Sequence, residues 1–212
     1  MIAAEFQWIE DVAYNTYSQF GEDGVLKAIF RVIGALNEWC MECGAADGLF
    51  FSNTRRLIEN GWHAVLIEAD RATFARLHQN CAGFGERVQC FQVQVDHDHR
   101  LETILRRVNA PLDIDLVVID VDGQDYYLWN ALHRYRPRVV VIEYDQNVDQ
   151  DFIPPLGGAG QAGERAIYSL GVGKYYTPVY RSKTNLIFVQ RPLDRLLKGT
   201  RESMLQQREA KL

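Results

Sequence analysis

The sequence predicts an α/β fold with a mostly parallel sheet between layers of helices, and three observations support this. Apolar runs of strand length alternate with helical patterns from residue 39 to residue 143, which implies parallel pairing through right-handed crossovers. The first of these runs ends in a glycine-containing loop. Near the C-terminal end, the β-rich runs 175–180 and 185–190 are separated by a short polar turn, which is typical of a hairpin.

Length and composition narrow the class of protein. The 212 residues suit one domain with a sizeable core. The net charge of -5, from 23 basic and 28 acidic residues in a mixed distribution, leaves no broad basic surface for a nucleic-acid backbone. No apolar stretch reaches the roughly 18 residues of a membrane span, and the N-terminal residues lack a basic segment before an apolar core. We therefore expect a cytoplasmic protein without a nucleic-acid partner.

The cysteines do not indicate a disulfide framework or a zinc site. Cys40 and Cys43 form a lone C-x-x-C pair, and Cys81 and Cys90 do not repeat that spacing. We interpret Cys40 and Cys43 as buried strand residues, with redox or metal chemistry as a minor alternative.

The elements of the first half follow one another with short connections. Apolar residues at helical spacing over 25–33 predict a helix before the first strand at 39–43. Ser52, Asn53 and Thr54 offer N-cap side chains for the next helix, which Gly61 ends. The later elements are a strand at 62–68, a helix at 72–80, a strand at 88–95 and a helix at 101–108.

The second half contains two more strands and a long irregular segment. Strands are expected at 116–120 and 139–143 and a helix at 126–132. Residues 145–163 show no clear element and form either a substrate lid or a mobile surface loop. A short helix is expected at 165–170, before the hairpin.

We predict one domain over 1–192, which begins with a helical lead-in over 1–36. The amphipathic helical tail over 193–212 packs on this domain or on a second copy of the chain, which would make a homo-oligomer.

The loop after the first strand has the features of a nucleotide-binding turn. Glu42 is followed by Gly44 and Gly48, and Ala45 and Ala46 stand where dinucleotide-binding loops often carry glycine. Glycine is needed where the backbone adopts positive φ or approaches a ligand closely. Alone, this pattern also fits an ordinary strand-to-helix turn.

Acidic residues follow each of the five parallel strands. Because ligands of open α/β sheets bind beyond the carboxyl ends of the strands, these side chains are expected around one site. They are Glu42, Asp47, Glu68, Asp70, Asp96, Asp120, Asp122, Glu143 and Asp145. Glu68 lies about 20 residues beyond the glycine loop, where an acidic side chain accepts hydrogen bonds from ribose hydroxyls. Asp96 is a candidate for the adenine amino group, although His97, Asp98 and His99 leave a metal site or a helix start as alternatives.

Asp120 and Asp122 are two residues apart, so both would face the cleft if the strand continues past Ile119. One would then lie near the reacting group and the other would take a proton or bind a cation. Capping of the following helix by Asp122 is the alternative.

Seven segments, in this order, resemble the FkbM family of methyltransferases that use S-adenosylmethionine (SAM). They are residues 17–23, 42–48, 52–54, 61–62, 66–70, 119–126 and 136–144. The resemblance extends from about Tyr17 to Arg191, is weakest over 145–163, and departs at Asp47, where the family usually has asparagine. It implies a three-layer Rossmann-like methyltransferase fold, with a mostly parallel seven-stranded sheet and an antiparallel C-terminal hairpin strand.

The resemblance also implies a function and a set of site residues. The expected reaction is methyl transfer from SAM to a hydroxyl of a sugar, glycan or natural product, a small-molecule or glycan acceptor. The expected cofactor-binding residues are Gln19, Glu42, Gly44, Ala45, Ala46, Asp47, Gly48, Asn53, Glu68, Ala69, Asp70, Asp96 and Asp120. We expect Asp120 to border the methyl group and Asp122 or Glu143 to be the base. A divalent cation held by Asp120 and Asp122 is an alternative that we do not favour.

Two other classes of protein remain open at this stage. A non-catalytic SAM- or nucleotide-binding module of the same fold would keep the site without turnover. An NAD-dependent oxidoreductase is disfavoured because the third glycine of its loop is absent.

Overall fold

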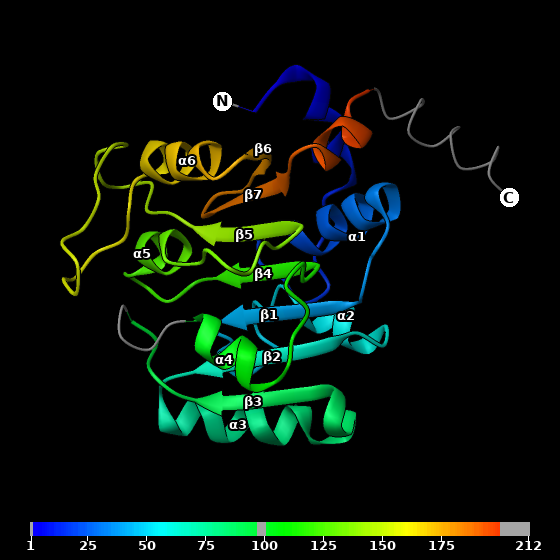
Figure 1. Ribbon diagram of the computed structural model, residues 1–212, viewed down its shortest axis with the longest axis vertical. Coiled ribbons are helices and arrows are strands. Elements are labelled where there is room, and N and C mark those ends of the chain that lie inside the picture. Colours follow the sequence, from blue (N-terminus) through cyan, green and yellow to red (C-terminus); the bar gives the residue numbers. More distant parts are fainter. Residues whose placement is uncertain (1, 97–100, 200–212) are drawn as a thin grey trace, which may run out of the picture.

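The computed structural model describes residues 2–96 and 101–199 and contains a seven-stranded sheet (Figure 1). The strand order is β3-β2-β1-β4-β5-β7-β6. The strands are β1 (Trp39–Cys43), β2 (His63–Glu68), β3 (Val88–Gln92), β4 (Leu116–Ile119), β5 (Val139–Glu143), β6 (Tyr176–Arg181) and β7 (Asn185–Gln190). The order reverses between β1 and β4, where a crevice for a ligand is expected.

The pairing confirms the predicted mixed sheet. Strands β1 to β5 are parallel, whereas β7 runs antiparallel to β5 and β6 antiparallel to β7. Cys43 is level with Ile119, and Ile119 with Ile142. The residues that follow β1 and β4 and the last residue of β5 therefore lie at one edge of the sheet.

Helices cover both faces of the sheet. The helices and 3-10 helices (η) are η1 (Ala4–Val12), α1 (Glu22–Ile33), α2 (Arg55–Glu59), α3 (Arg71–Cys81), η2 (Ala82–Arg87), α4 (Leu101–Arg107), α5 (Asp125–Asn130), α6 (Glu164–Gly173) and η3 (Leu193–Leu197). Side chains of η1, α1, α2 and α3 pack on one face, and those of α4, α5 and α6 pack on the other. The alternating residues of the central strands are buried on both faces, as parallel strands require.

Two elements end three residues away from the predicted end. β3 ends at Gln92 instead of residue 95, because the chain then leaves the sheet and residues 93–96 line a cavity. Helix α6 extends to Gly173 instead of 170. A Cβ at Gly171 would come within 2.3 Å of the Phe188 ring, so glycine stands here because the helix packs closely on β7, although glycine usually indicates a helix end.

The lead-in and the tail pack against each other. Trp8 Nε1 donates to the carbonyl of Leu197 at 2.9 Å, and Leu197 is buried. The described start of the predicted tail is the 3-10 helix η3, whereas residues 200–212 lie outside the described residues. The described part of the predicted helical tail is thus a 3-10 helix, which packs on η1.

No helix among residues 2–96 and 101–199 has the length and apolar character that a membrane crossing requires.

Candidate functional site

A cavity of about 840 Å³ lies at the carboxyl ends of the parallel strands. All of the predicted cofactor-binding residues except Asp47 and Gly48 line it, and so do the predicted catalytic residues Asp122 and Glu143. Its lining residues include seven carboxylates, but no lysine, arginine or histidine from the described part of the chain. These carboxylates are Glu42, Glu68, Asp70, Asp96, Asp120, Asp122 and Glu143. The cavity therefore favours a ligand that carries positive charge.

Gly44 brings the β1 loop against the end of β4. Its φ is +82°, and its N–H, like that of Ala45, donates to the carbonyl of Ile67. A Cβ at this position would lie 1.6 Å from the Asp120 carbonyl oxygen. Only glycine fits this close approach, which confirms the predicted need for glycine after the first strand.

The second half of the loop faces away from the cavity. The Asp47 carboxylate accepts from the N–H groups of Leu49 and Phe50 at 3.0 and 2.8 Å, which closes a turn. Gly48 packs on α3, where a Cβ would come within 2.6 Å of Leu77. Asp47 and Gly48, two of the expected cofactor-binding residues, therefore do not line this cavity, because Asp47 closes a turn and Gly48 packs on a helix.

Glu42 is a buried carboxylate that holds the segment before α2. It accepts from Ser52 Oγ at 2.7 Å, from the Asn53 N–H at 2.7 Å and from Thr54 Oγ1 at 2.5 Å. Burial raises the pKa of Glu42, whereas these hydrogen bonds lower it. Ser52 Oγ also accepts from the Arg55 N–H at 3.0 Å, whereas Thr54, the N-cap residue of α2, makes no capping side-chain hydrogen bond.

The β2 side of the cavity carries the predicted ribose acceptor. Glu68 is half-buried at the end of β2, and its Oε1 accepts from the Asp70 N–H at 2.7 Å. Asp70 in turn accepts from the Thr73 N–H at the start of α3, and this hydrogen bond lowers its pKa. Asp96, which follows β3, also lines the cavity. The neighbouring residues 97–99, for which a metal site was an alternative, lie outside the described residues.

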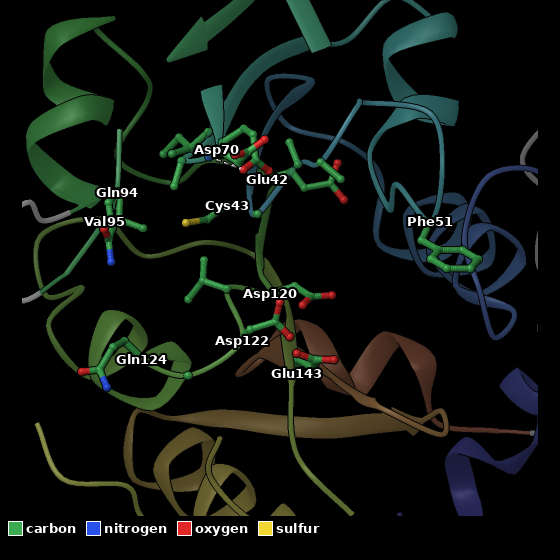
Figure 2. Close-up of a pocket in the computed structure, with 18 of the residues that line it drawn as sticks. Glu42, Cys43, Phe51, Asp70, Gln94, Val95, Asp120, Asp122, Gln124 and Glu143 are labelled. Atoms are coloured by element: carbon green, nitrogen blue, oxygen red, sulfur yellow. Dashed lines mark hydrogen bonds between the residues drawn. The ribbon is translucent and has the colours of Figure 1, made fainter. Parts of the chain in front are cut away.

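Across the cavity, Asp120, Asp122 and Glu143 point toward one another (Figure 2). One carboxylate oxygen of each lies within 4.8 Å of the others. The strand was expected to continue past Ile119, but it ends there, since Asp122 has a φ of +56°. The turn nevertheless brings both aspartates to the cavity. Asp122 does not cap the following helix, because the N-cap position of α5 is Gln124, which makes no capping side-chain hydrogen bond. The Asp125 carboxylate accepts the N–H groups of Val121 and Gly123, which come before the helix.

The carboxyl groups of Asp120 and Glu143 are joined by a hydrogen bond. Gln161 also donates its Nε2 to Glu143. Burial, followed by the charge of Asp120, raises the pKa of Glu143 to about 9. Burial raises the pKa of Asp120 to about 6. At neutral pH the pair thus holds one proton, mainly on Glu143, whereas Asp122 is the exposed member of the group.

Replacing Glu143 by glutamine is expected to stabilise the protein increasingly as pH rises. Above the ordinary glutamate pKa of 4.5 the unfolded chain ionises Glu143, whereas the folded chain keeps the proton until about pH 9. The stability that protonated Glu143 contributes to the folded chain at low pH is therefore lost as the pH rises from 4.5 to about 9. Because one pKa unit corresponds to about 1.4 kcal/mol, the variant should gain about 2–4 kcal/mol between about pH 5 and pH 8.

Urea denaturation at the two pH values measures this difference. The matched control is Glu86→Gln, at an exposed position outside the cavity, which should show the same stability change at both. If the gain in free energy of unfolding of Glu143→Gln does not grow with pH, this would contradict the inference that the Asp120–Glu143 pair holds a proton at neutral pH.

Several lining residues carry no signal in the sequence. Gln124 holds residues of the 145–163 segment at the cavity, because its amide accepts from the Gly157 N–H at 3.0 Å and donates to the Gly158 carbonyl at 2.9 Å. Phe50 and Phe51 are exposed aromatic residues at the opposite side, with ring centroids 3.9 Å apart. Asn185 lies on β7 directly opposite Glu143. Asn185 could have been recognised as a lining residue only from the strand register, which follows from the antiparallel pairing of β5 and β7.

Comparisons with solved structures identify the fold. TomG from Streptomyces achromogenes, an O-methyltransferase involved in tomaymycin synthesis and solved with SAM, is 20% identical; 90% of this chain and 91% of that chain are covered, with a TM-score of 0.54. An O-methyltransferase from Bacillus cereus in complex with SAH is 17% identical, with 90% and 92% covered and a TM-score of 0.54.

A magnesium protoporphyrin IX methyltransferase from Synechocystis with bound SAM is 13% identical, with 80% and 77% covered and a TM-score of 0.50. No family model matches the chain, and no curated protein matches its sequence. The chain thus has the α/β Rossmann-like methyltransferase fold.

Proposed function

We propose that the protein is a SAM-dependent O-methyltransferase of the FkbM type. The observation that carries this proposal is the position of the cavity, whose charged lining residues are all acidic and which lies at the strand order reversal of a fold shared with methyltransferases solved with SAM or SAH. SAM carries a sulfonium and an ammonium group, and both suit a cavity lined by carboxylates. The acceptor is a hydroxyl of a sugar, glycan or natural product.

The cofactor lies between the β1 loop and the end of β2. Gly44, Ala45 and Ala46 allow the backbone to approach it, and Glu68 accepts from the ribose hydroxyls. Asp96 is the candidate partner of the adenine amino group. Gln19 and Asn53 also line the cavity and are assigned to the methionine half.

Methyl transfer is an in-line displacement, so alignment of the acceptor oxygen and exclusion of water are the main tasks of the protein. Asp122 is assigned as the base, because it is the exposed carboxylate of the three and is the first that an acceptor entering from solvent would meet. Glu143, our other candidate, is protonated at neutral pH and holds the carboxyl of Asp120 through their hydrogen bond. Asp120 borders the transferred methyl group.

Calorimetric titration with SAM, SAH and NAD tests the cofactor assignment, and Glu68→Gln is the informative variant. Loss of a charged acceptor should weaken SAM binding by about 10- to 150-fold, since a charged hydrogen bond contributes roughly 1.5–3 kcal/mol. Glu10→Gln, at an exposed position outside the cavity, should bind SAM like the wild type. Equal SAM affinity in Glu68→Gln would defeat the ribose assignment, and binding of NAD but not SAM would defeat the whole proposal. SAM binding without methylation of any acceptor would favour the non-catalytic module.

Chelation distinguishes direct base catalysis from metal assistance. A cation bound by the three carboxylates would lower the acceptor pKa. However, two of them already bond to each other and Gln161 occupies an oxygen of Glu143, so we expect unchanged turnover after EDTA treatment. Loss of turnover with EDTA and its recovery on adding magnesium would instead establish the metal-assisted reaction.

A further inference from the structure

Two adjacent aromatic residues, Phe50 and Phe51, form an apolar surface in the wall of the main cavity, which we call the phenylalanine pair. Both side chains line the cavity, yet they are 67% and 46% exposed. Single exposed apolar residues are common on protein surfaces, whereas aromatic residues that gather in the wall of a cavity indicate contact with a ligand. None of the proposed cofactor contacts involves these two rings.

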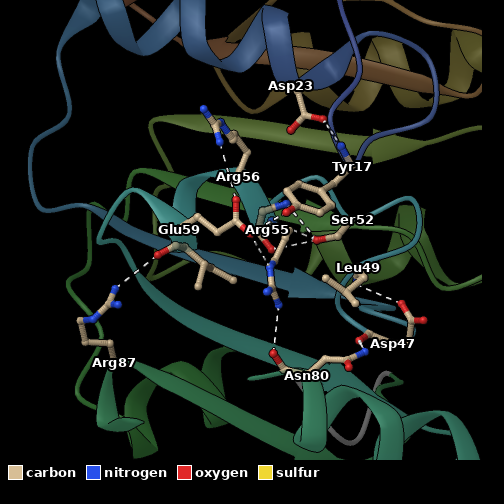
Figure 3. A network of polar contacts seen from close by, with 12 residues as sticks. Tyr17, Asp23, Asp47, Leu49, Ser52, Arg55, Arg56, Glu59, Asn80 and Arg87 are labelled. Carbon is tan, nitrogen blue, oxygen red and sulfur yellow. Dashed lines mark hydrogen bonds and ion pairs between the residues drawn. The ribbon is translucent and has the colours of Figure 1, made fainter. Parts of the chain in front are cut away.

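The phenylalanine pair lies in a turn that is anchored at both ends. At one end, the Asp47 carboxylate accepts from the Phe50 N–H, and Nδ2 of Asn80 in α3 donates to the Asp47 carbonyl at 2.9 Å (Figure 3). At the other end, the buried Ser52 donates its hydroxyl to Glu42. The two rings are thus held in place without being buried themselves, which lowers the entropic cost of binding a ligand on them.

The position and backbone of Phe51 indicate that its ring serves the acceptor. Figure 2 shows Phe51 on the opposite side of the view from Gln94 and Val95, which precede Asp96, the candidate partner of the adenine group. Phe51 has a φ of +61°, a conformation that bulky residues rarely adopt and that glycine would adopt without strain. A phenylalanine at this position therefore contributes through its side chain.

The charges of the cavity restrict the acceptor further. Among the lining residues that the structure describes, the charged side chains are all carboxylates. An anionic group next to Asp122 would lie among like charges, whereas hydroxyl groups can donate to its carboxylate. A wall of hydrogen-bond acceptors beside an apolar pair suits a ligand with one polyhydroxylated part and one apolar part.

We propose that the acceptor is a glycoside with an apolar aglycone and without negative charge, and that the phenylalanine pair binds the aglycone. This proposal rests on the methyltransferase function. The sugar hydroxyls lie toward Asp122, and the aglycone packs on Phe50 and Phe51, away from the reacting oxygen. Asp47 is a positioning residue, because it holds the turn that presents the two rings. Contacts with a remote part of the substrate contribute to orienting the reacting hydroxyl.

Titration calorimetry with matched glycosides, on protein saturated with SAH, tests the proposal. The probes are the phenyl and methyl β-D-glucopyranosides, the phenyl and methyl β-D-galactopyranosides, and phenyl β-D-glucuronide. Each phenyl glycoside should bind at least about 10-fold more tightly than its methyl counterpart, the factor expected for burial of an aromatic ring. The glucuronide adds a carboxylate and should bind at least about 10-fold more weakly than phenyl glucoside.

Three results would overturn the proposal. They are equal affinity for phenyl and methyl glycosides, preference for the glucuronide, and absence of binding by both neutral phenyl glycosides at about 10 mM, where a ligand with a Kd of about 1 mM is nearly saturated.

Variants of the phenylalanine pair then locate the aglycone. Phe50→Ala and Phe51→Ala should each bring the affinity for a phenyl glycoside toward that for the methyl glycoside and leave SAH affinity unchanged. Tyr175→Ala is the matched control, since Tyr175 is 67% exposed with a φ of +69° but lies outside the cavity. It should behave like the wild type. An unchanged phenyl preference in both phenylalanine variants, or a loss of SAH affinity in either, would overturn the assignment.

Substitutions of Asp47 test its positioning role. Asp47→Ala should reduce the preference for phenyl over methyl glycosides, whereas Asp47→Asn should keep it, because the amide oxygen accepts the same N–H groups. An unchanged preference in Asp47→Ala would exclude that role. SAH is titrated into each protein first. Failure of the wild type to bind SAH contradicts the proposed methyltransferase function, whereas SAH binding without a phenyl preference contradicts only the inference about the acceptor.

Discussion

Replacing Gly44 by alanine is expected to abolish SAH binding and to lower the free energy of unfolding by about 3–5 kcal/mol. This magnitude combines overpacking with the strain of a positive φ at a residue with a Cβ. The new methyl group would stand 1.6 Å from the Asp120 carbonyl oxygen. The β1 loop and the end of β4 would have to separate, and both border the cofactor in the proposed function. Urea denaturation and SAH titration measure the two effects.

Gly61 provides the control for backbone strain alone. Its φ is +102°, but a Cβ there would meet nothing within 4 Å. Gly61→Ala should therefore cost about 1–2 kcal/mol, the penalty for the left-handed conformation, and should leave SAH affinity unchanged. If both variants lose the same stability and both still bind SAH, the close contact of Gly44 with Asp120 does not shape the site.

Replacing Asp122 by asparagine should lower turnover by about 10²- to 10⁴-fold, the usual contribution of a positioned general base. Asparagine keeps the size of the side chain but does not accept the acceptor proton. Asp122 is exposed at the rim of the cavity, so SAM affinity and stability should stay close to those of the wild type. Single-turnover methylation, together with SAM titration, separates the chemical step from cofactor binding.

Asp113→Asn is the matched control, since Asp113 is an exposed aspartate outside the cavity. It should leave turnover unchanged. Full activity in Asp122→Asn would assign the proton transfer elsewhere, with Asp120 as the remaining ionised carboxylate of the group.

The sequence predicts most of the fold because strand periodicity and order are local properties. The apolar runs at Trp39–Cys43 and Val139–Glu143 are buried on both faces and appear as strands at the expected places. The predicted end of helix α6 at residue 170 was three residues early, because Gly171 packs closely against Phe188 inside the helix. Local patterns cannot show which distant side chain a helix must accommodate.

The same limit applies to the site. The acidic strand ends were predictable, since parallel strands place them at one edge. The turn in which the Asp125 carboxylate accepts from the Val121 and Gly123 N–H groups was not, because it depends on the positive φ of Asp122. Asn185 reaches the cavity through the antiparallel pairing of β7 with β5, and Gly157 and Gly158 reach it through their hydrogen bonds with Gln124. Both depend on contacts between residues far apart in sequence.

Glu42 places a constraint on how this chain can diverge. Its carboxylate is satisfied by Ser52, Asn53 and Thr54, and two of these donors are side-chain hydroxyls. A change to glutamine at position 42 would bring an amide donor toward hydroxyls that now donate, so positions 42, 52 and 54 should covary among homologues. In a double-mutant cycle, substitutions at these positions should have strongly non-additive effects on stability, because the loss of either partner leaves the other buried without a hydrogen bond.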